Sequence, residues 1–313
     1  MQRPTGSPPE SVARSTAAGT AFALAAYAMW GVAPIYWKQL GQIPAAELTA
    51  WRALYSAVLG VVLLGVTGRL RELGHALRNA RHALPIALSA ALLGVNWLVF
   101  LFAVQTDRIT DTSLGYYVNP LVSVALGFLV LRERLDAAQW VAVCVAAAGV
   151  GWWTSQLGGL PWIAATLAIS FALYGLVRKL APVRSLVGFA LEMLFLAPVA
   201  VAFLVAQPAG TLALSDGDAA QHAWMAASGI VTAAPLVCFA SATRRLPLSA
   251  IGIFQYLAPS LALLLAVFYF GEPFTSDHAI TFGFVAVALA IFSVDSFRST
   301  RQDSSAIPDR RTR

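Results

Sequence analysis

The chain has 313 residues, of which 58% are hydrophobic and 12% charged, and its mean hydropathy is +0.71. Because soluble domains carry about twice this share of charged residues, the composition excludes a disordered chain, a disulfide scaffold and a cytosolic enzyme. The net charge of +6 does not indicate a nucleic-acid partner, since the basic residues are scattered between apolar runs. The sequence therefore predicts an all-α polytopic membrane protein with the lipid bilayer as its main surroundings.

Apolar runs separated by Arg, Gly, Pro and Asp predict ten transmembrane helices. Only a helical bundle can satisfy so many backbone groups in hydrocarbon. The expected spans are residues 19–37, 45–67, 84–105, 110–131, 138–155, 159–180, 184–206, 221–242, 248–270 and 277–297.

The basic residues indicate the orientation of these spans. Eighteen of the 21 Lys and Arg residues fall on one side of the membrane, whereas only Lys38 and Arg108 fall on the other and Arg52 lies inside a span. Positively charged loops stay in the cytoplasm, so both termini are expected there. Residues 1–18 are expected to form a disordered cytoplasmic tail, and residues 298–313 a basic one.

The two halves of the chain match each other. A shift of 139 residues superimposes Tyr117 on Tyr256, Pro120 on Pro259 and Glu133 on Glu272. A shift of 140 places Lys38 on Arg178, each at the end of a span. Residues 19–157 and 158–297 are therefore interpreted as two five-helix repeats. Because five is odd, the second repeat enters the membrane from the opposite face, and the two are inverted.

Pro120 and Pro259 fall near the middle of the fourth and ninth spans. Each removes a backbone hydrogen bond, so both are expected to kink their helices. A fixed structural bend and a broken helix that forms part of a binding site are equally open interpretations.

Several polar side chains lie inside the spans, where they are costly unless they face a cavity or a partner. They are Arg52, Asn96, Tyr116, Tyr117, Asn119, Glu192, Gln255 and Tyr256. Trp30, Trp97 and Tyr174 supply aromatic walls. This mixture suits a small organic solute better than a bare ion, although packing or interfacial anchoring is an equal alternative for any one tyrosine.

Arg52 and Glu192 coincide under the 140-residue shift. Both lie about 11–12 Å from opposite surfaces of the membrane, so we expect them to pair or to share a water-filled cavity. Such a pair could fix the helix register, or it could take part in substrate binding or proton coupling.

No motif for bond-making chemistry is present. The four histidines fall in loops or at span ends, and no Walker loop, GxSxG or HExxH pattern occurs. We therefore expect no metal site, no cofactor and no enzymatic activity.

The segments ELTAWRALYS (47–56), LGYYVNPL (114–121) and FQYLAPS (254–260) closely resemble RarD-type proteins of the EamA family, in the drug/metabolite transporter superfamily. The likeness covers nearly the whole chain outside its tails. It implies ten helices in two inverted repeats, a bacterial inner-membrane location and secondary transport of a small organic solute. Two positions depart from the family pattern: Trp51 stands where His is usual, and Phe102 where Trp is common.

These motifs point to a central lining and to a function. The expected lining residues are Tyr117, Asn119, Pro120, Gln255, Tyr256 and Pro259, with Asn96, Trp97 and Tyr116 beside them. The expected function is export of a metabolite or drug by alternating access, driven by a proton or substrate gradient. An importer or facilitator on the same scaffold and a non-transporting scaffold or sensor are the alternatives. The sequence leaves substrate, coupling ion and oligomeric state open.

Overall fold

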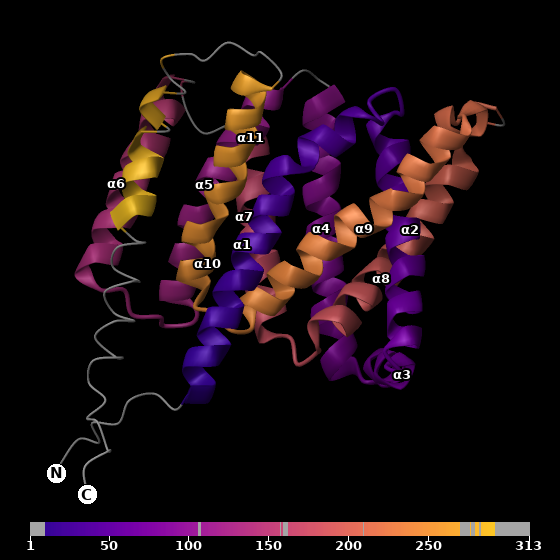
Figure 1. Cartoon of the computed structure of the whole chain (residues 1–313), viewed down its shortest axis with the longest axis horizontal. Coiled ribbons are helices and arrows are strands. Elements are labelled where there is room, and N and C mark those ends of the chain that lie inside the picture. Colours follow the sequence, from indigo (N-terminus) through magenta and orange to yellow (C-terminus); the bar gives the residue numbers. More distant parts are fainter. Residues whose placement is uncertain are drawn as a thin grey trace, which may run out of the picture.

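The computed structural model describes residues 10–105, 108–156, 158, 162–208, 210–269, 276, 279–281 and 283–291, and within these ranges every regular element is a helix. In chain order these are α1 (Glu10–Lys38), α2 (Ala45–Val66), α3 (Leu70–Arg78), α4 (Ala80–Gln105), α5 (Ile109–Leu129), α6 (Ala137–Gln156), α7 (Trp162–Leu180), α8 (Ser185–Ala206), the short 3-10 helix η1 (Ala213–Asp216), α9 (Ala219–Thr243), α10 (Leu248–Gln255) and α11 (Leu257–Phe268). A last apolar helix, Ala279–Ile291, is drawn in yellow in Figure 1.

Seven helices of the described chain are long and apolar enough to cross a membrane. Three shorter apolar helices, Leu114–Leu129, Leu248–Ala262 and Ala279–Ile291, occur as well. Each of these helices coincides in sequence with one of the expected spans. The chain is therefore an all-helical, multi-pass membrane protein, because hydrocarbon thickness sets the length of an apolar helix.

The N-terminal tail differs from the expectation. Helix α1 begins at Glu10, so it extends into residues 10–18, which the sequence assigns to the cytoplasmic tail. These residues contain no Pro or Gly, and nothing in them interrupts a helix before Gly19. Residues 1–9 and the basic tail 298–313 lie outside the described residues.

The ninth expected span is interrupted, whereas the fourth is continuous. Helix α10 ends at Gln255 and α11 begins at Leu257. Pro259 has no N–H to donate to the carbonyl of Gln255, so the helical ladder fails at this turn. The Ser260 hydroxyl donates to the Tyr256 carbonyl at 2.6 Å and partly compensates. Helix α5 continues through Pro120.

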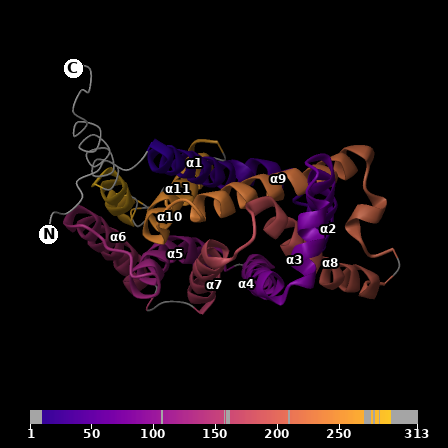
Figure 2. The same cartoon turned by 90° about the horizontal axis from the view of Figure 1, so that it is seen from below.

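The helices form two rows when they are viewed from below (Figure 2). One row holds α1, α9, α10 and α11, the other holds α4, α5, α6 and α7, and α2 and α8 lie together at one side. We call the end of the bundle that carries α3 and the start of α1 the α3 end, and the other end the opposite end (Figure 1). The connections α5–α6, α7–α8 and α9–α10 all lie at the α3 end.

Small residues bring neighbouring helices close together. A Cβ atom on Gly252 of α10 would lie 2.7 Å from the carbonyl oxygen of Pro120 in α5. A Cβ atom on Gly60 of α2 would lie 3.0 Å from the Cβ atom of Ala190 in α8. Glycine at such contacts lets helix backbones approach closely, which is how helices associate in membranes without a hydrophobic driving force.

Substituting Gly252 tests this packing. We expect Gly252→Ala to destabilise the protein by about 1–3 kcal/mol, because the added methyl group meets a backbone atom that cannot move aside alone. The matched control is Gly151→Ala in α6, where a Cβ atom meets nothing within 4 Å. Helix propensity makes that change neutral or stabilising by about 1 kcal/mol. Equal melting temperatures of the two variants in detergent would contradict the close α5–α10 contact.

Candidate functional site

A buried ion pair joins three helices near the α3 end. Glu192 of α8 and Arg178 of α7 have side-chain exposures of 0% and 1%, and Arg178 Nε lies 3.5 Å from Glu192 Oε1. The hydroxyl of Ser89 in α4 donates to the same carboxylate oxygen at 2.6 Å. Gly188 makes room for the pair, since a Cβ atom there would overlap the guanidinium group. The carboxylate thus has a counter-charge and a hydrogen bond, as a buried ion requires.

The expected direct pair between Arg52 and Glu192 does not form. Helices α2 and α8 do pack together, but each residue lies seven positions from the start of its 22-residue helix. Because the two helices run in opposite directions, the two residues are separated by about 10 Å along the helix axis. The sequence predicts Arg178 at the cytoplasmic end of a span. The structure places it in the last turn of α7, with its side chain facing inward.

Arg52 is stacked on aromatic rings instead. Its Cζ atom lies 3.9 Å from the centroid of the Trp97 ring and 5.5 Å from that of Trp37. Among the described residues, no carboxylate oxygen lies within 4.0 Å of Arg52 and its Nε has no hydrogen-bond acceptor. A cation–π contact stabilises the charge without occupying its donors.

Asn96 and Asn119 hold α7 in place. Asn96 Nδ2 donates to the Leu167 carbonyl at 3.1 Å and to the Ser170 hydroxyl at 3.0 Å. Asn119 Nδ2 donates to the Ala168 carbonyl at 2.6 Å. These amides were expected to line a cavity, whereas in the structure they join α4 and α5 to consecutive carbonyls of α7.

The expected tyrosines of the two repeats meet each other. The ring centroids of Tyr117 and Tyr256 are 6.3 Å apart, and Trp153 lies 5.5 Å from Tyr117. Tyr256 is fully buried, and its hydroxyl has no partner among the described residues. Gln255 precedes it at 5% exposure, and no hydrogen bond of its side chain occurs in the described chain.

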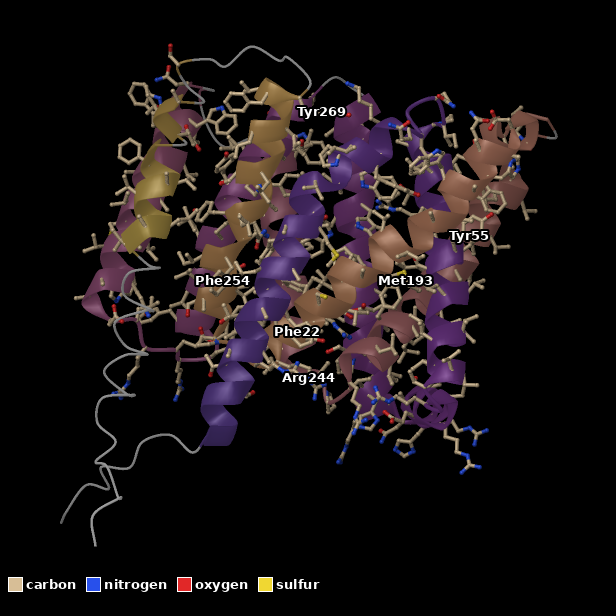
Figure 3. All side chains as sticks on the ribbon, viewed as in Figure 1. Phe22, Tyr55, Met193, Arg244, Phe254 and Tyr269 are labelled. Carbon is tan, nitrogen blue, oxygen red and sulfur yellow. The ribbon has the colours of Figure 1, made fainter. Side chains whose placement is uncertain are left out.

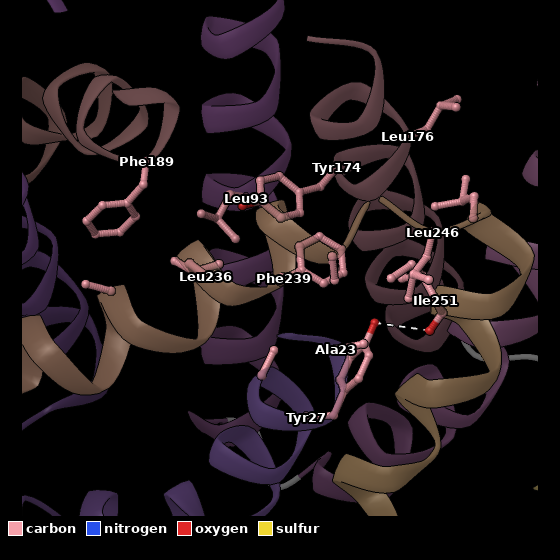
Figure 4. Packing of buried hydrophobic residues seen from close by; sticks show 14 of the residues in the cluster. Ala23, Tyr27, Leu93, Tyr174, Leu176, Phe189, Leu236, Phe239, Leu246 and Ile251 are labelled. Carbon is pink, nitrogen blue, oxygen red and sulfur yellow. Dashed lines mark hydrogen bonds between the residues drawn. The ribbon is translucent and has the colours of Figure 1, made fainter. Parts of the chain in front are cut away.

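The expected aromatic walls belong to a closed core between α1, α7 and α9 (Figure 4). Tyr174 is fully buried and stacks on Phe239 with 5.6 Å between ring centroids. Trp30 packs on the other side of this cluster, 5.7 Å from Phe239. Tyr27 extends the core to α10, because its hydroxyl donates to the Ile251 carbonyl at 3.2 Å.

Glu133 forms a second charged junction at the α3 end. From the α5–α6 connection its carboxylate accepts the N–H groups of Leu248 and Ser249 at 2.6 and 2.9 Å and the Ser249 hydroxyl at 2.8 Å. Lys179 Nζ lies 3.8 Å away. A carboxylate at a helix N-terminus satisfies free N–H groups and complements the helix dipole. In the sequence Glu133 stands out only by its match with Glu272 in the second repeat, and this match does not indicate the contact with α10.

The same junction reaches α9. Lys179 Nζ donates to the Thr243 carbonyl at 3.3 Å and also to the Leu246 carbonyl. Arg244 follows α9 and donates to the Val183 carbonyl. Burial and the nearby cation Arg178 lower the pKa of Arg244. Figure 3 shows Arg244 at this end, whereas Tyr269 lies at the other.

Glu47 forms the corresponding polar contact at the opposite end. Its buried carboxylate accepts the N–H groups of Ala213 and Leu214 at 2.8 and 2.9 Å. It thereby ties the first turn of α2 to η1. The only sequence signal for this role was an acidic residue in the first turn of an apolar span.

A double-mutant cycle tests which cation neutralises Glu192. We expect Glu192→Leu alone to lower the free energy of unfolding by about 3–5 kcal/mol, because it leaves Arg178 buried and unpaired. Combining it with Arg178→Met should restore most of this stability. Combining it with Arg52→Met should give additive effects within about 0.5 kcal/mol. Equilibrium unfolding in detergent micelles measures the parent, these three variants and the single variants Arg178→Met and Arg52→Met, and coupling to Arg52 in place of Arg178 would refute the observed pairing.

Comparisons with known proteins agree with this architecture. A model of the EamA-like transporter family matches residues 17–154 and 159–294. A Vibrio cholerae protein named "Uncharacterized transporter" is 43% identical over 284 residues, covering 90% of this chain and 93% of its own. "Protein RarD" of Escherichia coli is 41% identical over 293 residues, covering 93% and 99%.

A solved crystal structure shares the fold, with a TM-score of 0.69 at 19% identity over 91% of this chain and 98% of its own. Its low identity makes it evidence for the fold alone. The sequence matches carry the family assignment, since they extend over nearly the whole length of each relative. The chain therefore belongs to the EamA-like transporter family, as a RarD-type membrane transporter of the drug/metabolite superfamily.

Proposed function

We propose that the protein is a secondary active exporter of a small organic metabolite or drug. In this proposal the chain crosses the bacterial inner membrane ten times, with both termini in the cytoplasm. Residues 19–157 and 158–297 act as two inverted repeats that rock against each other around a central site. The observation that carries the proposal is that the helix contacts between the two halves occur in symmetry-related pairs.

The large contacts between the halves have counterparts in which the matching helices are exchanged. The contact of α1 with α9 corresponds to that of α7 with α4, and the contact of α2 with α9 corresponds to that of α8 with α4. In the same way, the contact of α5 with α7 corresponds to that of α11 with α1. The remaining large contacts, α2 with α8 and α5 with α10, join helices that match each other. An axis in the membrane plane would produce this pattern.

Small residues repeat the pattern at atomic detail. Gly60 lies against Ala190, and Ala50 belongs to the same packing cluster as Ala200. The 140-residue shift places Gly60 on Ala200 and Ala50 on Ala190, so the two pairs occupy equivalent positions. The two separate family matches, one in each half of the chain, support the same interpretation.

The proposed movement requires an end of the bundle that can open. At the α3 end, Glu133 and Lys179 link the α5–α6 connection, α7 and the start of α10 through charge-assisted contacts. The excess of basic residues in the connections of this end supports a cytoplasmic position. We therefore assign this junction as the closure on the cytoplasmic side.

Thiol labelling from the two sides tests alternating access without knowledge of the substrate. In a background with Cys144→Ser and Cys238→Ala, single reporters are placed at two buried positions, Leu246→Cys at the α3 end and Met225→Cys at the opposite end. A membrane-impermeant maleimide is added to oriented vesicles. The α3-end reporter should react only from the cytoplasmic face, and the other only from the outer face.

Loss of the junction should shift the two labelling rates in opposite directions. Glu133→Gln removes the ion pair with Lys179, and charge-assisted contacts contribute about 1.5–3 kcal/mol. We expect labelling at Leu246→Cys to rise about tenfold or more and labelling at Met225→Cys to fall. The control is Glu72→Gln, because Glu72 lies at the same end but pairs on the surface. Equal changes at both reporters, or no change, would favour a scaffold without alternating access.

A further inference from the structure

Arg52 is a charge within a membrane-spanning helix that the described protein leaves without a counter-ion. Two other cations in the membrane-spanning helices, Arg178 and Lys179, lie 3.5 and 3.8 Å from the carboxylates of Glu192 and Glu133. The Arg52 guanidinium lies over the rings of Trp97 and Trp37, and its Nε finds no acceptor in the part of the chain that the structure describes. Charges at this depth are costly, and where they are retained they commonly mark a substrate or ion pathway.

The stacking geometry leaves the hydrogen-bonding edge of Arg52 available. Trp97 contacts the guanidinium at 3.9 Å through its ring. The N–H donors of arginine lie in the plane of that group and form a fork that matches two carboxylate oxygens. A residue held by stacking alone is therefore oriented and still able to bind an oxyanion.

The surroundings of Arg52 are aromatic and lie well inside the bundle. Trp37 of α1 and Trp97 of α4 meet Arg52 of α2. Arg52 and Tyr116 are each seven residues from the first residue of their helices at the opposite end, or about 10 Å deep. Phe100 continues this wall, 6.2 Å from Tyr116. An apolar body with one anionic group fits these walls.

Three acids described at this end of the bundle already have partners. Glu47 accepts two backbone N–H groups of the η1 segment, Asp111 lies 2.6 Å from Arg108, and Asp218 accepts the N–H group of Gln221. None of the three is free to neutralise the ammonium group of an amino acid. The distribution of charge therefore favours a ligand with a carboxylate and no ammonium.

We propose that Arg52 and Trp97 form the carboxylate subsite for a small apolar or aromatic monocarboxylic acid. In this site the guanidinium binds the carboxylate, and the tryptophan ring orients the guanidinium. The identification of this acid as the transported solute rests on the function proposed above. The binding step itself does not depend on it.

Four ligands with the same phenylalkyl body test the head group. They are 3-phenylpropionate, L-phenylalanine, 2-phenylethylamine and 3-phenylpropanol, assayed by thermal shift and calorimetry on the purified full-length protein. A set of straight-chain and aryl carboxylates is tested beside them. We expect the carboxylates without an ammonium group to bind, and phenylalanine, the amine and the alcohol to bind at least tenfold more weakly.

Substitutions then assign the binding to the subsite. Arg52→Gln should weaken carboxylate binding at least thirtyfold, Arg52→Lys should restore part of it, and Trp97→Leu should weaken it several-fold. The control is Arg69→Gln, which removes an exposed arginine from the α3 end of the bundle. Because Arg52→Gln could unfold the protein, its melting temperature without ligand must stay close to that of the Arg69→Gln control. If Arg52→Gln lowers the melting temperature, the comparison is made with the Arg52→Lys variant.

Failure of the subsite and failure of transport give different results. The subsite is refuted if no carboxylate binds the folded protein, if the amine or alcohol binds best, or if Arg52→Gln binds as well as the parent. In those cases opposite labelling changes at Leu246→Cys and Met225→Cys would still support transport. Conversely, Arg52-dependent binding without vesicle flux or alternating labelling would support the subsite and refute the transporter.

Discussion

A charge inside hydrocarbon must be compensated where it lies, and this requirement decides which helices of the protein are joined. Glu192 meets Arg178 and Ser89, so α8, α7 and α4 are fixed to one another at one depth. Glu133 and Lys179 do the same for the end of α5, α7 and the start of α10. Small residues then let the backbones approach, while the ionic contacts specify which helices meet.

The two halves of the structure match without being identical. Helix α5 runs through Pro120, whereas the matching segment breaks between α10 and α11 beside Pro259. Tyr117 and Tyr256 nevertheless meet at 6.3 Å. A transporter built from inverted repeats must hold its halves in unequal conformations whenever one side is closed. The difference between these two helices is the kind of inequality that the proposed mechanism requires.

The spans could be predicted from the sequence because the length of an apolar run can be read along the chain and compared with the thickness of the hydrocarbon core. Contacts between side chains could not, since they depend on rotation about each helix axis. Arg178 could be placed at the end of a span, but its sequence position gives no sign of its partner Glu192. Asn119 donates to a backbone carbonyl of α7, and such a partner leaves no signature in composition or spacing.

The proposed carboxylate subsite also bears on what would drive the proposed export. Glu192 already has Arg178 as its counter-charge, so among the described residues no free carboxylate stands beside Arg52 as a proton carrier. An anionic solute needs none in order to leave a cell that is negative inside. Moving one negative charge outward across 100 mV is favourable by about 2.3 kcal/mol. This free energy corresponds to roughly a fiftyfold concentration ratio, so the membrane potential alone gives a carboxylate exporter its direction.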